Sequence, residues 1–234
     1  MRRGRSLERL LYLVSTGCFV VGLAFLAWPV ARIALTGYAT GEIQAEALAA
    51  WDRQPSGYHS KRDGVLLLEI PRLGLRRVVP DGATVAHLRQ YGVAHISWTA
   101  FPPVGKEFAA PRPAHATEPP RLAMIAAGPA AAPQVPGGVV AIAGHRTTYG
   151  APFFRVGKLH PGDGIVLLYD GWRYTYRVTR QVTVRPSDVG VLDDSGPEIA
   201  LISCSPPFSA AYRLVVFGQL DTVTALQRAE WRGR

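Results

Sequence analysis

The hydrophobic pattern divides the chain into two unlike parts. From Leu10 to Val30 the sequence reads LLYLVSTGCFVVGLAFLAWPV, with no charged side chain. An α-helix made of these 21 residues would be about 30 Å long, which matches the hydrocarbon core of a bilayer. The pattern therefore predicts a transmembrane helix, and we place the anchor at residues 10–35.

The charges on either side of this run predict its orientation. Four arginines lie within residues 1–9, whereas Arg32 is the first charge that follows the run. The positive-inside rule then puts a basic tail, residues 1–9, in the cytoplasm and the chain from about residue 36 outside the cell membrane. A cleaved signal peptide is the alternative, but its apolar core usually has only about 7–15 residues and a small-residue cleavage site follows it. We therefore expect a single-pass membrane protein.

Two further segments differ from a packed domain. Residues 36–63 combine a short helical pattern from Glu42 to Trp51 with a polar stretch, and they are interpreted as a stalk. Residues 101–136 contain nine prolines and ten alanines. Such a composition buries little apolar surface and favours extended backbone, so this segment is expected to be an inserted surface loop.

The remaining sequence predicts a mainly β domain over residues 64–221, followed by a C-terminal tail at 222–234. Short runs rich in Val, Ile, Leu, Tyr and Thr alternate with Gly, Pro and Asp, as in GVLLLEIPRLGL, GGVVAIAGH, DGIVLLYDG, WRYTYRVTRQVTV, EIALISC and YRLVVFGQL. A helical turn is expected near Thr84. About seven short strands with one or two short helices favour a closed or nearly closed β-barrel.

The charge and the cysteine content limit the partners and the chemistry that the chain can have. The net charge is +9, but beyond residue 35 the 21 basic and 16 acidic residues are scattered, and no nucleic-acid-binding motif is present. Attraction to anionic lipid headgroups or wall polymers is the more natural use of this charge. The two cysteines are Cys18, inside the apolar run, and Cys204, so they cannot form a disulfide within the domain. Cys204 is either a reactive thiol or a small packed hydrophobe.

A reactive Cys204 would need a base. Of the six histidines, five lie in polar, turn-like or proline-rich sequence and are expected to be solvated on the surface: His59, His87, His95, His115 and His160. His145 differs, because it follows the apolar run VVAIAG at a predicted strand end, as Cys204 follows IALIS. Arg213 opens the next strand after the loop SPPFSAAY, and its alternative interpretation is an exposed charge on an edge strand. These strand ends could meet at one rim of a barrel.

Together these three residue types suffice for acyl transfer. A thiol can act as the nucleophile and an imidazole can carry the proton, while a guanidinium favours the thiolate and stabilises an oxyanion. The Cys and His residues lack the C-x-x-C or H-x-x-x-H spacing of a zinc site, and the sequence has no glycine-rich phosphate loop. We therefore expect no metal or other cofactor.

The motifs VAIAGHRTTYGAPF, KLHPGDGIVLLYDGWRYTYRVT, VRPSDVGVL and ALISCSPPFSAAYRLVVFGQL resemble the sortase family, and within it the class E sortases of high-GC Gram-positive bacteria. The resemblance covers about residues 64–100 and 137–221. It implies a membrane-anchored cysteine transpeptidase with an eight-stranded β-barrel. Cys204 would be the nucleophile, His145 the general acid and later base, and Arg213 the stabiliser of substrate and oxyanion. Candidate substrate-binding residues are Thr147, Tyr149 and Ser203.

The resemblance also implies the partners. A surface protein with an L-A-x-T-G sorting signal would be cleaved between Thr and Gly through a thioester and transferred to an amine of a cell-wall precursor or a pilin lysine. One departure concerns substrate choice: the family's T-L-x-T-C strand end has Ala200 and Ser203 in place of its two threonines.

Two other classes of protein were weighed against the sortase interpretation. An L,D-transpeptidase would place His-Gly-Cys in one compact motif, whereas His145 lies 59 positions before Cys204. A non-catalytic membrane-tethered β-barrel, serving as a scaffold or binding module with Cys204 simply packed, remains open.

Overall fold

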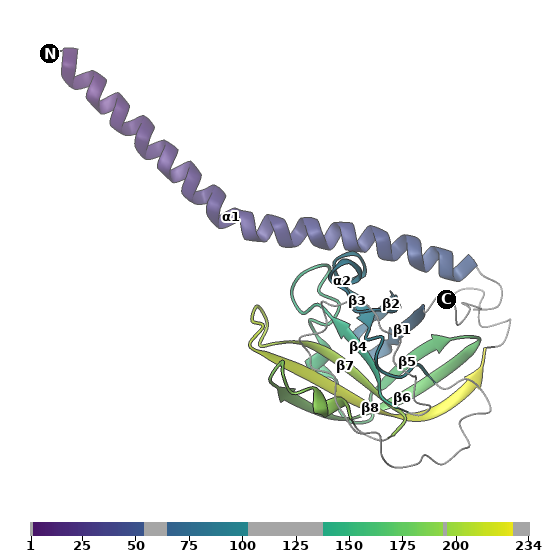
Figure 1. Cartoon of the computed structure of the whole chain (residues 1–234). Helices are drawn as coiled ribbons and strands as arrows, with labels where there is room; N and C mark the ends of the chain where they lie inside the picture. The colour runs from purple at the N-terminus through teal and green to yellow at the C-terminus, as the bar shows by residue number, and fades with distance from the viewer. Residues whose placement is uncertain (1, 54–64, 103–137, 194–195, 227–234) are drawn as a thin grey trace.

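The computed structural model describes residues 2–53, 65–102, 138–193 and 196–226, and it consists of one long helix and a β-barrel (Figure 1). Helix α1 spans Arg2–Arg53. Nearly all of the predicted Pro/Ala-rich insert and the end of the predicted C-terminal tail lie outside the described residues. The last strand continues to Ala225, beyond the predicted end of the domain.

Eight strands form one sheet in the order β2-β1-β5-β6-β8-β7-β4-β3. Their bounds are β1 Leu66–Ile70, β2 Leu75–Val79, β3 Val93–His95, β4 Val140–Gly144, β5 Gly164–Tyr169, β6 Trp172–Val184, β7 Glu198–Ser205 and β8 Tyr212–Ala225. The connections hold helix α2 (Val85–Tyr91) and the 3-10 helices η1 (Pro71–Leu73), η4 (Val156–Lys158) and η5 (Val189–Leu192). The predicted mainly β, eight-stranded barrel is confirmed.

Strand alternation separates two apolar layers. Ile142 of β4 and Leu201 of β7 belong to the large buried cluster to which most of the strands contribute. Their neighbours Ala141 and Ala200 face a smaller cluster on the other side of the sheet, next to Leu192 of η5. Successive side chains of a strand point to opposite faces, so these two clusters cover both faces of β4 and β7. A strand that is buried on both faces needs apolar residues at every position, which explains the continuous apolar runs in the sequence.

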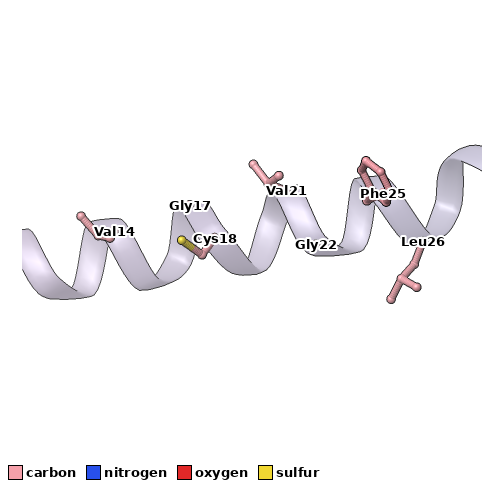
Figure 2. Close-up of a pocket in the computed structure, with 7 residues that line it drawn as sticks. All are labelled: Val14, Gly17, Cys18, Val21, Gly22, Phe25 and Leu26. Atoms are coloured by element: carbon pink, nitrogen blue, oxygen red, sulfur yellow. The ribbon is translucent and has the colours of Figure 1, made fainter.

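The first half of α1 has the surface expected of a membrane span. By length and composition the helix is able to cross a bilayer, and its large apolar side chains from Leu11 to Leu35 are exposed. Figure 2 shows a hollow along this segment that is lined by Val14, Cys18 and Phe25 together with other residues of the same helix. The helix bends near its middle (Figure 1) and contains Pro29, a residue type that commonly kinks helices.

The second half of α1 packs on the barrel, where the sequence suggested a stalk with a short helix. Thr40, Gln44 and Trp51 are the buried residues of this segment, with 3%, 2% and 1% of their surface exposed. Their spacing places them on one helical face. Trp51 packs with Leu67 and Val166 of the barrel. Residues 36–53 are therefore an integral part of the folded domain.

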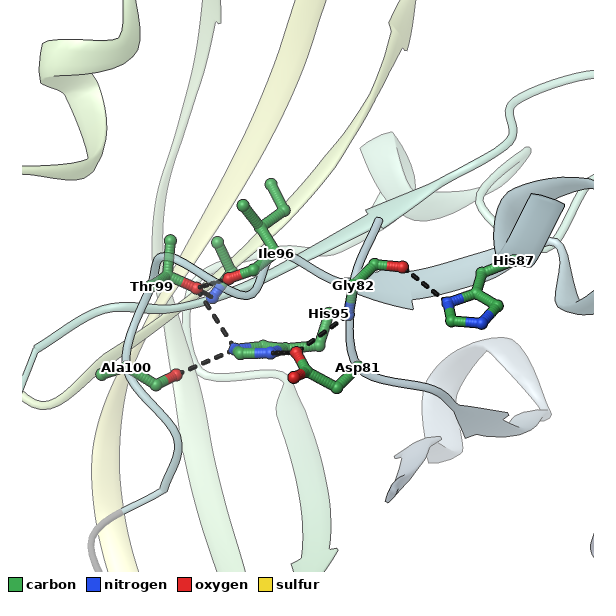
Figure 3. Close-up of polar contacts among 8 residues, drawn as sticks. Asp81, Gly82, His87, His95, Ile96, Thr99 and Ala100 are labelled. Atoms are coloured by element: carbon green, nitrogen blue, oxygen red, sulfur yellow. Dashed lines mark hydrogen bonds and ion pairs between the residues drawn. The ribbon is translucent and has the colours of Figure 1, made fainter. Parts of the chain in front are cut away.

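His95 closes the barrel, and its predicted surface position is wrong. A bridge between Asp81 and His95 joins the two edge strands of the sheet, β2 and β3. The His95 side chain is fully buried, and its Nδ1 lies 2.7 Å from Asp81 Oδ1 (Figure 3). Its Nε2 lies 3.0 Å from Ala100 O and 3.2 Å from Thr99 Oγ1. Sequence reasoning missed this site because nothing near His95 in the chain reveals a carboxylate 14 residues away.

The hydrogen bonds around His95 fix the role of its ring. The Thr99 hydroxyl donates to Ile96 O, so Thr99 presents an oxygen lone pair to His95. The Nε2 side of the ring therefore faces two oxygen acceptors, Ala100 O and Thr99 Oγ1, and the Nδ1 side faces the Asp81 carboxylate. The hydrogen bond between His95 and Asp81 links β3 to the segment that follows β2.

We expect Asp81→Ala to lower the free energy of unfolding by about 1.5–3 kcal/mol, because the buried N–H of His95 loses a charged acceptor. Asp81→Asn should cost less, since an amide oxygen still accepts this hydrogen bond. Urea unfolding of the full chain in detergent micelles measures both changes. The control is Asp221→Ala, which removes an exposed ion pair with Arg177 and should cost less than about 1 kcal/mol. A loss for Asp81→Ala no larger than that of the control would contradict this role.

Candidate active site

The parallel pairing of β4 with β7 brings His145 next to Cys204. Ala143 pairs with Ile202, and His145 and Cys204 each follow two residues later. The two residues therefore occupy matching positions where the strands end, and neighbouring strands lie about 4.8 Å apart. Ser203 Oγ donates to Gly144 O at 2.9 Å, which joins the strands one residue before both side chains.

Ser203 is buried at this position. It is 2% exposed and its hydroxyl is directed at the neighbouring strand. It therefore links β4 to β7, and its predicted contact with substrate stays a prediction.

Arg213 lies directly across from Cys204 in the antiparallel β7–β8 pair. Side chains at paired positions of adjacent strands project from the same face, so the guanidinium can reach the thiol. In the structure its Nη1 donates to Ala210 O and Tyr212 O, both at 3.0 Å. Arg213 is thus held at the β7–β8 turn, next to a partly exposed Cys204.

The surroundings of His145 leave the residue half-buried and its ring short of polar partners. Its Nδ1 lies 3.3 Å from Thr148 Oγ1, while Nε2 is buried without a hydrogen-bond partner among the described residues. Burial, followed by the positive charge of Arg89, lowers the pKa of His145. The ring of Tyr149 packs beside it, with centroids 4.7 Å apart. The hydroxyl next to the imidazole belongs to Thr148, which the sequence had not singled out.

The loop after His145 is tightly wound. Tyr149, Gly150 and Ala151 have φ values of 51°, 76° and 45°, so three successive residues lie in the left-handed region. For Tyr and Ala this conformation is uncommon and costs energy, so the surrounding contacts must hold it in place. One such contact is the hydrogen bond from Ala151 N to Thr148 O, at 2.9 Å.

Arg146 is a site residue that sequence reasoning missed. Its Nε and Nη1 are buried without a hydrogen-bond partner in the described part of the chain. Its guanidinium lies against Gly157, beside Leu214, the residue that pairs with Ser203. Burial lowers the pKa of Arg146, and the negative charge of a Cys204 thiolate opposes that effect. The only sequence signal was its position directly after His145 in AGHRTTYG.

The arrangement suits acyl transfer through sulfur. A partly exposed thiol lies near the end of β7, the neighbour of β4, at the position that matches the imidazole. Arg213 is paired with Cys204 across β7 and β8, and the pKa of Arg146 responds to the charge of Cys204, so both cations can oppose negative charge that develops at the thiol or at an attacked carbonyl. Among the residues that the structure describes, no group of three or more His, Cys, Asp or Glu side chains could hold a metal ion.

Comparisons with known proteins agree with this chemistry. The family model described as "Sortase domain" matches residues 102–221. Sortase SrtE1 of Streptomyces coelicolor is 36% identical over 100 residues, which cover 38% of this chain and 28% of that protein. Sortase SrtE2 of the same organism is 33% identical over 93 residues, 36% of this chain and 37% of its own. The chain therefore matches only about a third of the length of these curated relatives.

Solved structures show the same fold. The crystal structure of sortase E1 from Streptomyces coelicolor with a tripeptide in the active site has a TM-score of 0.54 and 25% identity, and the match covers 72% of this chain and 93% of that one. Listeria monocytogenes sortase A shares the fold at 22% identity, with a TM-score of 0.51 and coverage of 71% and 94%.

The fold and the family match define a sortase, and this chain belongs to the sortase family. The relatives named above, SrtE1, SrtE2 and sortase E1, also confirm the predicted resemblance to class E sortases.

We predict that Arg89→Gln raises the pKa of His145 toward its ordinary value, because the substitution removes a positive charge that disfavours the imidazolium. NMR titration of the His145 ring in the full chain, with selectively labelled histidine, measures the change. Arg72→Gln is the control, since Arg72 pairs with Asp163 in another part of the barrel. An unchanged pKa of His145 in Arg89→Gln would refute the assigned cause.

Proposed function

We propose that this chain is a membrane-anchored cysteine transpeptidase that acts on an L-A-x-T-G type sorting signal. It cleaves the Thr–Gly bond and transfers the protein to an amine of a cell-wall precursor or a pilin lysine. The observation that carries the proposal is the strand pairing that sets His145 beside Cys204 and Arg213 opposite the thiol. The presence of a tripeptide in the active site of the related sortase E1 supports a peptide substrate.

The first half of the proposed reaction forms a thioester. The Cys204 thiol gives its proton to His145, and the resulting thiolate attacks the threonine carbonyl carbon. The carbonyl oxygen becomes an oxyanion that the guanidinium of Arg213 stabilises. The C–N bond to glycine then breaks, and His145 gives its proton to the departing amine. A lowered pKa suits His145 to this role because it makes the imidazolium a stronger acid.

The second half returns the enzyme to its starting state. The acceptor amine gives a proton to neutral His145 and attacks the thioester carbonyl, again through an oxyanion near Arg213. The C–S bond breaks, an amide forms, and sulfur leaves as the thiolate beside the imidazolium. Tyr149 and Thr147, in the loop after His145, would line the peptide-binding groove, and the unpaired donors of Arg146 would add a second cationic group.

The proposed location follows from α1. Its apolar half would span the cell membrane with the N-terminus in the cytoplasm, and the barrel would lie on the outer side. The substrate and the acceptor amine would therefore both be met outside the cytoplasm. No catalytic cofactor is needed in this scheme.

The test is capture of the acyl-enzyme. The full chain in detergent micelles is incubated with an L-A-x-T-G peptide and should gain the mass of the acyl fragment that ends at the threonine. An L-P-x-T-G peptide should react more slowly. Cys204→Ala should abolish the adduct, while Cys18→Ala, at the other cysteine, should leave it unchanged. His145→Ala and Arg213→Ala should each slow capture by a factor on the order of 10²–10³.

Capture by Cys204→Ala at the wild-type rate would refute the proposal. If neither peptide is captured and Cys204 resists alkylation until the chain is denatured, the chain is a scaffold with a packed thiol.

A further inference from the structure

The second half of α1 touches the loop that carries His145. A Cβ added at Gly37 would lie 3.6 Å from Gly150 N and 3.8 Å from its Cα. A Cβ added at Gly150 would lie 3.8 Å from Thr40 Cγ2 and 3.9 Å from Gly37 O. Helix and loop therefore meet backbone to backbone through two glycines, at the left-handed turn that follows the imidazole.

A second connection runs through α2. Thr40 Oγ1 donates to Arg89 O at 3.2 Å, and Gln44 Nε2 donates to Tyr91 O at 2.8 Å. Both acceptors are in the last turn of α2, which ends at Tyr91 and has Gly92 as its C-cap. The carbonyl of Gly92 accepts the backbone N–H of His145. The same helix also carries Arg89, whose charge helps to lower the pKa of His145.

Buried polar contacts fix α1 in this place. Gln44 bonds to both backbone groups of Val78 in β2, with Nε2 to O at 2.9 Å and Oε1 to N at 3.0 Å. A buried amide that slides along the barrel would lose these partners at a cost of about 1–3 kcal/mol per unpaired group. The register of α1 on the barrel is therefore specific.

The residues of α1 that contact the His145 loop affect the pKa of His145 by shielding it from water and not by a charge of their own. Gly37, Thr40 and Gln44 carry no charge. The titratable and charged groups around the imidazole come from other elements: Arg89 from α2, Arg146 and Tyr149 from its own loop, Cys204 from β7 and Arg213 from β8. An uncharged substitution at Gly37 thus leaves this set of charges intact.

We propose that residues 37–44 of α1 position His145, so that the continuation of the membrane anchor forms part of the active-site wall. The catalytic importance of this positioning rests on the proposed function, whereas the contact itself does not. Gly37 follows the apolar run by seven residues, which is about 10 Å of helix. With α1 as the membrane anchor, the site would be held near the membrane surface.

The chain offers a matched pair of glycines to test this. Gly41 lies one turn further along the same helix, where it is exposed, and nothing lies within 4 Å of a Cβ added there. Gly37→Leu and Gly41→Leu therefore change helix propensity equally, but only Gly37→Leu pushes on Gly150. The readouts, taken on the full chain in nanodiscs, are the pKa of His145 by NMR, the melting temperature and the rate of peptide capture.

We expect Gly37→Leu to open the His145 loop to water, which raises the pKa of His145 toward its ordinary value. Capture should slow by a factor on the order of 10–100, because small misplacement of a catalytic group is costly. Gly37→Ala should stay near wild type, since its Cβ makes only ordinary contact. Gly41→Leu should match wild type in every readout.

Thr40→Val, which removes the bond to Arg89 without added bulk, should shift the pKa of His145 in the same direction even if Gly37→Leu does not fold.

Three results have distinct meanings. An unchanged pKa of His145 in both Gly37→Leu and Thr40→Val overturns the proposal, even if their melting temperatures fall. Equal effects of Gly37→Leu and Gly41→Leu overturn it as well. The third result is a shift in the pKa of His145 that occurs only in Gly37→Leu and Thr40→Val, while even the wild-type chain captures no peptide. The shift would support the positioning role, and the missing capture would refute the transpeptidase function.

Discussion

The parallel pairing of β4 with β7 is the constraint on which the site depends. It aligns two strand ends that lie 59 positions apart in the sequence, so that His145 and Cys204 meet without any local motif that joins them. A slip of one residue would turn either side chain to the opposite face of the sheet. The apolar layers on both faces of these strands and the bond from Ser203 to Gly144 O oppose such a slip.

The charged residues that the structure describes around His145 and Cys204 are all positive. Arg89, Arg146 and Arg213 surround a thiol and an imidazole that has no carboxylate partner among the described residues. A carboxylate would hold the imidazole as a cation, whereas this environment favours the neutral ring until negative charge appears on sulfur or on a tetrahedral intermediate. The site therefore couples the charge of His145 to the chemistry at Cys204.

The apolar runs predicted the N-terminal apolar helix and most strands, and their ends indicated that His145, Cys204 and Arg213 could lie together. These features could be predicted because they follow from periodicity and from residue types at strand ends. The burial of His95 and the docking of Gln44 could not. Each is a polar residue that needs at least one distant partner, Asp81 at 14 positions from His95 and Tyr91 at 47 from Gln44, and only the folded barrel brings these partners together. The position of Arg146 in the site could not be predicted either, because the residues around its guanidinium come from η4 and β8, which are distant in the sequence.

The most direct test of the account is whether His145 and Cys204 are neighbours in the folded chain. Paired positions on adjacent strands, about 4.8 Å apart, are within the Cα separation that a disulfide spans. In a Cys18→Ala background, His145→Cys should form a disulfide with Cys204 under mild oxidation, detected as a cross-linked peptide by mass spectrometry. Two thiols that stay free and can both be alkylated under the same oxidation would contradict the strand register on which the site is built.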